Sequence, residues 1–517
     1  MVSTVYTAGL EGVNGFLVTV ECSLSHPFQE NNNNNTLDVV GLPDNAVKEA
    51  RERVKSAVVN AGLRFPDARL VVNLAPADKK KSGSAYDLAI CISILQADEQ
   101  LPQGACEGCC FIGELSLSGQ IRPVRGVLCM VMAARDAGFQ KVFVPMANGG
   151  EASVAEGIEV YPVSDLASLI AHLRAQKPLA VRPFDKRIFA EGIGSSPVDF
   201  SDVKGQQTAK RALEIAAAGG HNVLFIGPPG TGKSMLAKRI PTILPEMTFE
   251  EALETTKIHS VAGALRDGEN LVTARPFRSP HHTMSAVSLA GGGAFPKPGE
   301  VSLAHNGVLF LDELPEFPKQ VTETLRQPLE DRKITITRAS GHCTFPSNFM
   351  LVCAMNPCRC GYYGHPTKKC TCKREEIQKY MSRISGPLLD RIDIQIEVSS
   401  LTFDELSKAE KSESSAVIRQ RVNAARERAV TRFRQGGDHI FANADMSPAQ
   451  LQKYAQVDEM GKELLRSAYD SMGLSARGHD RILRVARTIA DLEGSELIGA
   501  SHMAEAIRMR SLDRKYW

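Results

Sequence analysis

The stretch NVLFIGPPGTGKS, residues 222–234, places a glycine-rich turn between a short apolar run and the start of a helical pattern. This is the spacing of a P-loop in the strand–turn–helix context that the motif requires. The glycines let backbone N–H groups turn toward phosphate, and the N-terminus of the following helix adds positive potential there. We therefore expect an α/β domain that binds ATP through eight consecutive residues: Gly227, Pro228, Pro229, Gly230, Thr231, Gly232, Lys233 and Ser234.

Four residues have predicted roles around the phosphates. Lys233 is expected to reach the β- and γ-phosphates, and the hydroxyl of Ser234 to bind Mg²⁺. Downstream, the apolar run GVLFL ends in Asp312 and Glu313. We expect Asp312 to complete the Mg²⁺ shell and Glu313 to polarise the attacking water. An apolar run that ends in two acids is weak evidence alone, but it becomes strong evidence after a P-loop.

Two further polar residues, Asn356 and Arg391, have predicted roles at the γ-phosphate. The run FMLVCAM ends at Asn356, which we predict to contact the γ-phosphate or the attacking water as a sensor. Arg391 lies in SGPLLDRID. In oligomeric ATPases such an arginine reaches the γ-phosphate bound by the neighbouring subunit. The alternative for Arg391 is a helix-capping arginine, because arginine ion pairs are common.

The composition of the 517-residue chain is that of a soluble globular protein with several domains. A formal net charge of +2 means that DNA would have to be held by a local surface or a pore. No apolar run approaches the roughly 18 residues of a membrane span. The first residues also lack the pattern of a signal peptide. We therefore expect a cytoplasmic protein without membrane association.

Changes in pattern along the chain predict four parts. Residues 1–176 and 201–398 are expected to be α/β domains, the second of them the ATPase core. Residues 177–200 contain proline, glycine and serine without periodicity, which is typical of a linker. Residues 399–517 have helical patterns and predict a C-terminal helical lid. We expect the run Asn31–Asn35 to form a flexible loop, and we assign it no function.

A loop rich in glycine, proline and lysine carries four cysteines in a C-x-C…C-x-C pattern: Cys358, Cys360, Cys370 and Cys372. Four thiolates can form a tetrahedral Zn²⁺ site, which would fold a short segment that has no core of its own. We therefore favour zinc over free thiols. Three other cysteines, Cys106, Cys109 and Cys110, lack a fourth partner nearby in the sequence, and we expect them to be buried instead.

The run KITITRASGHCTF, residues 333–345, alternates with a period of two around Ser340 and Gly341, which predicts a β-hairpin. Arg338 and His342 near its tip, with Lys333 at its start, are our candidates for contacts with DNA phosphates. A solvent-exposed turn without a ligand is an equally consistent interpretation of each residue taken singly.

The segment Ala274–Glu300 lengthens the connection between the P-loop and the two acids beyond a usual crossover. It contains the pair His281 and His282. Because no cysteine accompanies these histidines, we expect a structural or DNA-facing loop rather than a metal site.

Together these motifs resemble AAA+ proteins of the magnesium-chelatase and minichromosome-maintenance branch. Residues 275–313, the stretch NPCRCGYYGHP at 356–366 and the stretch SARGHDRILRVARTIADLEG at 475–494 are similar to the ComM/YifB family more specifically. The resemblance covers nearly the whole chain. It implies a hexameric DNA helicase that promotes branch migration while incoming DNA recombines during natural transformation, and an insertion at residues 274–300 that projects toward the central pore. It also implies a sensor-2 arginine at Arg477, with Arg481 as the alternative.

Residues 82–146 resemble the proteolytic domain of Lon, to which a domain of RadA is related. Ser84 falls on the position of the nucleophilic serine of Lon. The position of the lysine that activates this serine is occupied here by Leu128. A serine hydroxyl without a neighbouring base is a poor nucleophile. We therefore expect a non-proteolytic domain.

The sequence is consistent with three functions, one of which it favours. The preferred prediction is a homo-hexameric translocase on single-stranded or branched DNA, with ATP, Mg²⁺ and Zn²⁺ as cofactors. A chelatase-type AAA+ remodeler of a protein partner is the first alternative, but the chelatase ATPase subunit resembles residues 200–510 only. A Lon-like ATP-dependent protease is the second alternative, and Leu128 opposes it.

Overall fold

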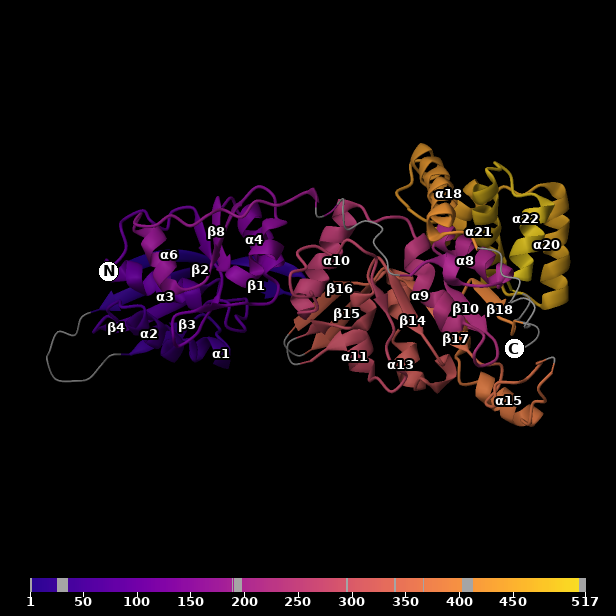
Figure 1. Ribbon diagram of the computed structural model, residues 1–517, viewed down its shortest axis with the longest axis horizontal. Helices are drawn as coiled ribbons and strands as arrows, with labels where there is room; N and C mark the ends of the chain where they lie inside the picture. Colours follow the sequence, from indigo (N-terminus) through magenta and orange to yellow (C-terminus); the bar gives the residue numbers. More distant parts are fainter. Residues whose placement is uncertain are drawn as a thin grey trace. The chain divides into compact units, whose positions relative to one another are not determined.

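The computed structural model describes residues 2–25, 36–187, 189, 198–293, 296–338, 341–365, 367–401 and 412–510. The run Asn31–Asn35 and part of the predicted linker lie outside these residues. The chain divides into two compact units (Figure 1). The first contains residues 1–190 and 249–272, and the second contains residues 191–248 and 273–517.

The first unit is built on a seven-stranded sheet with the strand order β3-β4-β2-β1-β5-β8-β9 (Figure 1). Strands β1 and β2 form a long antiparallel pair, whereas β5, β8 and β9 run parallel to one another. The strands of this unit are β1 (Val2–Glu11), β2 (Asn14–Ser25), β3 (Leu37–Val40), β4 (Arg69–Ala75), β5 (Cys109–Phe111), β6 (Glu114–Leu115), β7 (Ile121–Arg122), β8 (Lys141–Pro145) and β9 (Glu159–Val163).

Helix α3 is the central helix of this unit, and nearly all of its side chains are buried because its sequence, DLAICISILQA, is apolar on every face. The cysteines at positions 106, 109 and 110 are buried, as expected. The helices are α1 (Asn45–Lys48), α2 (Ala50–Asn60), α3 (Asp87–Ala97), α4 (Val127–Asp136), η1 (Met146–Asn148), α5 (Gly149–Ser153) and α6 (Leu166–Leu173).

One more helix of the first unit comes from much later in the chain. Helix α10 (Phe249–Ala262) packs against α4. The hydroxyl of Ser260 donates a hydrogen bond to the buried carboxylate of Glu151, and the carbonyl of Ser260 accepts one from the Gly126 N–H at 3.2 Å. The sequence pattern predicts that residues 249–272 belong to the ATPase core. In the structure they complete the first unit.

The second unit contains a five-stranded parallel sheet with the order β11-β14-β17-β10-β18 (Figure 1). Its central strands are wholly buried and read as continuous apolar runs, which is typical of parallel sheets covered on both faces. The strands are β10 (Val223–Ile226), β11 (Phe277–Arg278), β14 (Val308–Leu311), β17 (Met350–Met355) and β18 (Ile394–Glu397). Because β17 lies between β14 and β10, the segments that follow these three strands meet at one edge of the sheet.

Short elements surround this sheet. Two small hairpins are present, β12 (Gly291–Gly292) with β13 (Lys297–Pro298) and β15 (Lys333–Arg338) with β16 (Gly341–Pro346). The helices are η2 (Phe200–Asp202), α8 (Gln207–Gly219), α9 (Lys233–Ile243), α11 (Ala286–Ala290), α12 (Glu300–Leu303), η3 (Leu314–Glu316), α13 (Lys319–Glu323), α14 (Arg326–Asp331), α15 (Arg374–Met381) and α16 (Gly386–Leu389).

The C-terminal part of the second unit consists of helices, as the sequence predicts. Helices α18 and α21 pack on α8, so that this part shares the core of the sheet domain (Figure 1). The helices are α18 (Ser415–Gln435), η4 (Asn443–Asp445), α19 (Pro448–Tyr454), α20 (Glu459–Met472), α21 (Ala476–Glu493) and α22 (Ala500–Arg508). Throughout the described ranges, no helix has both the length and the apolar composition needed to cross a membrane.

Candidate nucleotide site and cysteine cluster

The predicted phosphate loop joins the end of β10 to the start of α9. Gly230 and Gly232 have φ angles of +80° and +90°, which residues with a side chain rarely adopt. At Gly227 a Cβ atom would lie 2.3 Å from the carbonyl oxygen of Val398, so no side chain fits there. The loop thus has the tight backbone, followed directly by a helix N-terminus, that binds phosphate groups in P-loop proteins.

Lys233 and Asn356 come together at the edge of the sheet. The Lys233 ammonium donates hydrogen bonds to Asn356 Oδ1 at 3.2 Å and to the carbonyl oxygens of Gly227 and Pro228 at 2.7 Å and 2.9 Å. Burial lowers the pKa of Lys233, and the nearby Asp312 carboxylate opposes this shift. An anionic phosphate beside the ammonium would favour its charged form in the same way.

Ser234 and Asp312 form the second pair of the site. The Ser234 hydroxyl donates a 2.6 Å hydrogen bond to Asp312 Oδ2. A hydroxyl and a carboxylate so close together provide the hard oxygen ligands that Mg²⁺ prefers. The backbone N–H of Glu313 donates to Asp312 Oδ1 at 3.0 Å, and Glu313 itself has a φ of +54°. A left-handed backbone at a non-glycine residue is strained, and such strain is concentrated at functional sites.

Glu313 has a neighbour that no sequence motif predicts. His282 Nδ1 lies 3.3 Å from Glu313 Oε2. The His282 ring also stacks against His281, with ring centroids 4.2 Å apart, and meets the edge of Phe317 at 6.3 Å. The only sequence signal was the histidine pair itself, because nothing in its spacing indicates a contact with an acid 31 residues away.

Arg391 is held by its own chain. Its guanidinium forms an ion pair with the carboxylate of Glu330 and donates to the carbonyl oxygen of Pro387. Burial lowers the pKa of Arg391, and the positive charges of Arg326 and Arg477 lower it further. To reach a γ-phosphate bound by a neighbouring subunit, the Arg391 side chain would have to break its ion pair with Glu330. Glu330 had no motif by which the sequence could reveal it.

The two candidates for sensor 2 differ in exposure. The side chain of Arg477 is 68% exposed and lies 3.7 Å from Asp390, whereas that of Arg481 is only 7% exposed. Arg481 lies 3.6 Å from the buried Asp393, and burial lowers the pKa of Arg481 to about 10. Arg477 is therefore the arginine accessible to a ligand, while Arg481 belongs to an internal charge network.

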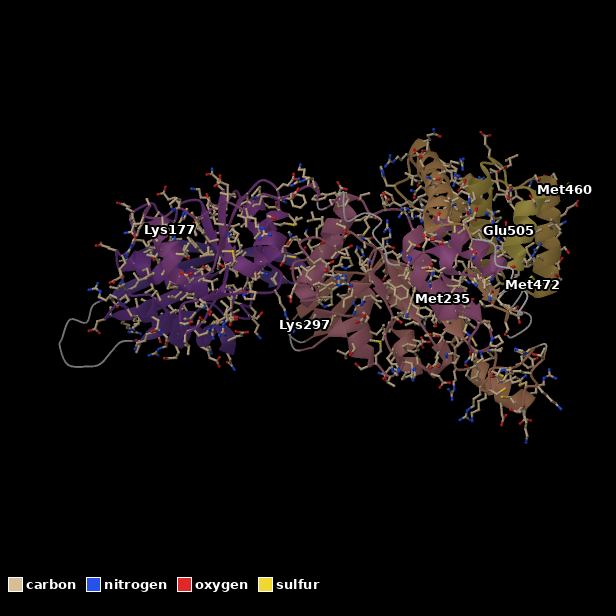
Figure 2. All side chains as sticks on the ribbon, viewed as in Figure 1. Lys177, Met235, Lys297, Met460, Met472 and Glu505 are labelled. Atoms are coloured by element: carbon tan, nitrogen blue, oxygen red, sulfur yellow. The ribbon has the colours of Figure 1, made fainter. Side chains whose placement is uncertain are left out.

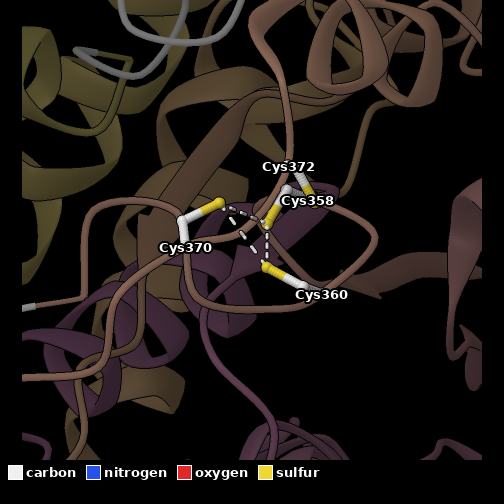
Figure 3. Close-up of side chains that lie close together, drawn as sticks. All are labelled: Cys358, Cys360, Cys370 and Cys372. Carbon is white, nitrogen blue, oxygen red and sulfur yellow. Dashed lines mark hydrogen bonds between the residues drawn. The ribbon is translucent and has the colours of Figure 1, made fainter.

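The four cysteines of the predicted zinc loop converge (Figure 3). Their Sγ atoms all lie within 4.8 Å of one another, with separations of 3.4 Å for Cys358–Cys360, 3.5 Å for Cys360–Cys370 and 3.7 Å for Cys358–Cys370. A tetrahedron with Zn–S bonds of about 2.3 Å has edges of about 3.8 Å, so this set of sulfur atoms fits zinc. Desolvation would raise the pKa of Cys360, but backbone N–H groups of Tyr362 and Thr371 lower it to about 6.

The candidate DNA contacts lie on the β15–β16 hairpin, which forms with Lys333 opposite Pro346 and Arg338 opposite Gly341. Lys333 and His342 are exposed. The side chain of Arg338 and the tip residues 339 and 340 lie outside the described part of the structure.

In the first unit, the position that resembles the catalytic lysine of Lon carries no base. The hydroxyl of Ser84 donates to the carboxylate of Glu114. Leu128 is wholly buried in α4, and its backbone N–H donates to Glu151 at 3.0 Å. An apolar side chain at the position of the lysine cannot deprotonate a serine.

The meeting of phosphate loop, paired acids and polar sensor at one edge of a parallel sheet that carries a helical C-terminal part defines an AAA+ P-loop protein. Comparison with family models makes this more specific. Residues 199–406 match the model "Magnesium chelatase, subunit ChlI", residues 28–148 match "Subunit ChlI of Mg-chelatase", and residues 412–510 match "Magnesium chelatase, subunit ChlI C-terminal". The match at residues 28–148 shows that the expectation of a chelatase resemblance confined to residues 200–510 was wrong.

Relatives match over almost the full length. Competence protein ComM of Haemophilus influenzae is 42% identical over 515 residues, which cover 99% of this chain and 97% of the relative. The protein YifB of Escherichia coli is 41% identical over 513 residues, with the same coverage of 99% and 97%. The chain belongs to the ComM/YifB family of magnesium-chelatase-like AAA+ proteins. Lon protease 2 of Bacillus subtilis is 32% identical over 152 residues, which cover 28% of this chain and 27% of that protein.

Proposed function

We propose that this chain is an ATP-driven DNA helicase or translocase that acts as a hexameric ring and promotes branch migration in natural transformation. The observation that carries this proposal is the place of the β15–β16 hairpin. It lies in the chain between Asp312–Glu313, at the end of β14, and strand β17, which leads to Asn356. A change at the γ-phosphate that moves these strand ends would therefore move the hairpin as well.

The chemistry of the hairpin supports DNA as the partner. Lys333 and His342 are exposed and hydrophilic, and Arg338 follows on the same strand as Lys333. Such side chains contact phosphate groups without reading the base sequence. A local basic hairpin also agrees with a chain whose overall charge is nearly balanced. The name of the Haemophilus relative, a competence protein, supports natural transformation as the process.

Exposed apolar side chains on the second unit support assembly into a ring. Met235 on α9 and Met460 on α20 are 47% and 68% exposed (Figure 2). Leu464 and Tyr469 add to the exposed apolar surface of α20. We infer that the exposed apolar side chains of α20 contact a second copy of the chain in the ring.

The residues at this edge of the sheet have different proposed roles in ATP hydrolysis. We infer that Lys233 binds the β- and γ-phosphates, that Ser234 and Asp312 bind Mg²⁺, and that Glu313 and Asn356 orient the attacking water. Arg391, after exchange of Glu330, would act on the γ-phosphate of the adjacent subunit. Arg477 would be the sensor-2 contact.

We also propose that Cys358, Cys360, Cys370 and Cys372 bind one Zn²⁺ per chain. The converging sulfur atoms support this, and their S–S separations suit tetrahedral coordination. Elemental analysis of freshly purified protein that was never exposed to a chelator should find about one zinc per chain. Protein that contains no zinc would remove the metal from the proposal.

A strand-displacement assay on forked and three-stranded DNA tests the motor. The wild type should separate or migrate the branched substrates with ATP, whereas Lys233→Ala should bind the same DNA without displacing a strand. Sedimentation of the protein with ATP and Mg²⁺ should detect the hexamer. ATP hydrolysis that no DNA stimulates, together with intact hexamers, would contradict the DNA motor and favour a remodeler of a protein partner.

A further inference from the structure

The cysteine loop lies directly against the phosphate loop. A Cβ atom added to Gly361 would come within 2.7 Å and 2.9 Å of the Cδ and Cγ atoms of Pro229, and 4.0 Å from the side chain of Asn356. Gly361 also has a φ of +85°. The backbone at this position therefore packs on the turn that holds the phosphates, and only glycine fits there without displacement.

The cysteine cluster determines where Gly361 lies. Gly361 follows Cys360 directly, and its N–H donates to the carbonyl oxygen of Cys358 at 3.0 Å. Cys358 in turn comes two residues after Asn356, at the end of β17. After β17 the chain turns at Cys358 and Cys360. This turn places Gly361 next to Pro229.

The other end of the loop is fastened to the segment that follows the two acids. After Cys372 the chain continues into α15, and then Arg383 donates to Glu316 Oε2 at 2.8 Å and to the carbonyl oxygen of Pro315 at 3.4 Å. Both acceptors belong to η3, which starts directly after Glu313. The cysteine loop thus continues from β17, contacts the phosphate loop and is joined through Arg383 to η3, which follows Asp312 and Glu313.

The loop has almost no apolar core that could hold this position. Among the described residues from 362 to 379, none is buried. A short segment without a core needs a metal or another cross-link to keep one conformation. The four convergent thiols provide the only comparable constraint within the described part of the loop.

We propose that metal bound by the four cysteines controls the affinity of this protein for ATP, by holding Gly361 against Pro229. This inference rests on the zinc site of the proposed function and goes beyond it, because it gives the metal a regulatory role at the nucleotide site. Removal of the metal frees the loop, and the phosphate loop loses the neighbour that supports its conformation.

The test measures equilibrium binding of a fluorescent, non-hydrolysable ATP analogue with Mg²⁺ to the full chain, and zinc content on the same samples. Extraction of zinc with a chelator should raise the Kd at least about tenfold, and addition of Zn²⁺ should restore it. Gly361→Ala keeps all four cysteines, so it should retain zinc but bind the analogue about tenfold more weakly.

Gly437→Ala is the matched control, because Gly437 has a similar φ of +80° but no atom within 4 Å of its added Cβ. It controls for backbone strain, and its Kd should stay within about twofold of the wild type. Zinc-loaded Gly361→Ala protein with a wild-type Kd would contradict the proposal that the contact between Gly361 and Pro229 supports ATP binding. Zinc extraction that leaves the Kd unchanged would contradict the proposal that the metal controls the affinity for ATP. A wild type that never contained zinc fails at the earlier step, the zinc site itself, and elemental analysis identifies that outcome separately.

Discussion

The imidazole Nδ1 of His282 lies 3.3 Å from a carboxylate oxygen of Glu313, so the insertion at residues 274–300 reaches the acid proposed to activate water. An imidazole beside this oxygen occupies one of the positions from which the carboxylate could bind the attacking water. We therefore expect a change in the insertion to alter the rate of ATP hydrolysis.

The first prediction concerns this pair. His282→Ala should raise the turnover number for ATP without DNA about two- to fivefold, with the KM for ATP within about twofold of the wild type. His282→Asn keeps a donor near Glu313 and should return the rate toward the wild-type value. His281→Ala removes the ring beside His282 but no described contact with Glu313, so we expect a smaller increase than in His282→Ala. A His282→Ala enzyme with an unchanged turnover number would contradict the role of this pair.

The second prediction tests whether Arg391 acts on a neighbour. Lys233→Ala should lose nucleotide binding or turnover, whereas Glu313→Gln and Arg391→Ala should each bind ATP without hydrolysing it. A mixture of Glu313→Gln and Arg391→Ala subunits should regain activity, because an intact arginine from one subunit then meets an intact glutamate of the next. Random mixing at equal amounts makes about a quarter of the interfaces competent. Mixtures that stay inactive at every ratio would leave Arg391 with its Glu330 ion pair only.

The third prediction is that the first unit does not cleave proteins. Casein should remain intact with ATP present, and Ser84→Ala should leave ATP hydrolysis unchanged, because Leu128 supplies no base at the position of the Lon lysine. Gel analysis of casein over time checks the first part, and a phosphate-release assay the second. Cleavage that depends on ATP and disappears in Ser84→Ala would revive the protease alternative.

The fourth prediction concerns the hairpin. Arg338→Ala and Lys333→Ala should keep DNA-free ATP hydrolysis and ring assembly but lose stimulation by DNA and strand displacement. Each lost phosphate contact should reduce the slope of log affinity against log salt concentration by roughly 0.7 to 0.9. Lys453→Ala, on α19 in the C-terminal helices, removes an exposed lysine elsewhere and should leave the slope unchanged. A wild-type slope and wild-type unwinding in Arg338→Ala would place this residue off the DNA path.

Much of this architecture was readable from local patterns. The P-loop, the apolar runs that end in Asp312 and Asn356, and the alternation over residues 333–345 each specify an element from neighbouring residues, and β10, β14, β17 and the β15–β16 pair form where these patterns predict them. The four cysteines were equally visible, because a chelating set has a composition that packing seldom produces.

Contacts between distant parts of the chain were not readable in this way. Helix α10 lies between two stretches of the ATPase core in sequence, yet Ser260 bonds Glu151 and the helix belongs to the first unit. Hydrophobic periodicity reports that a helix has a face to bury, but not which surface will cover it.

The sequence by itself therefore determined the class of protein, and it predicted the phosphate-binding residues and a zinc-type cysteine set, because each of these depends on residues close together in the chain. Tertiary structure alone decided that His282 meets Glu313, that Glu330 holds Arg391 and that Gly361 packs on Pro229. These contacts arise from the strand order and from loops that return to the same sheet edge. Their partners lie far apart in sequence, and their distances are set by the packing of the whole unit.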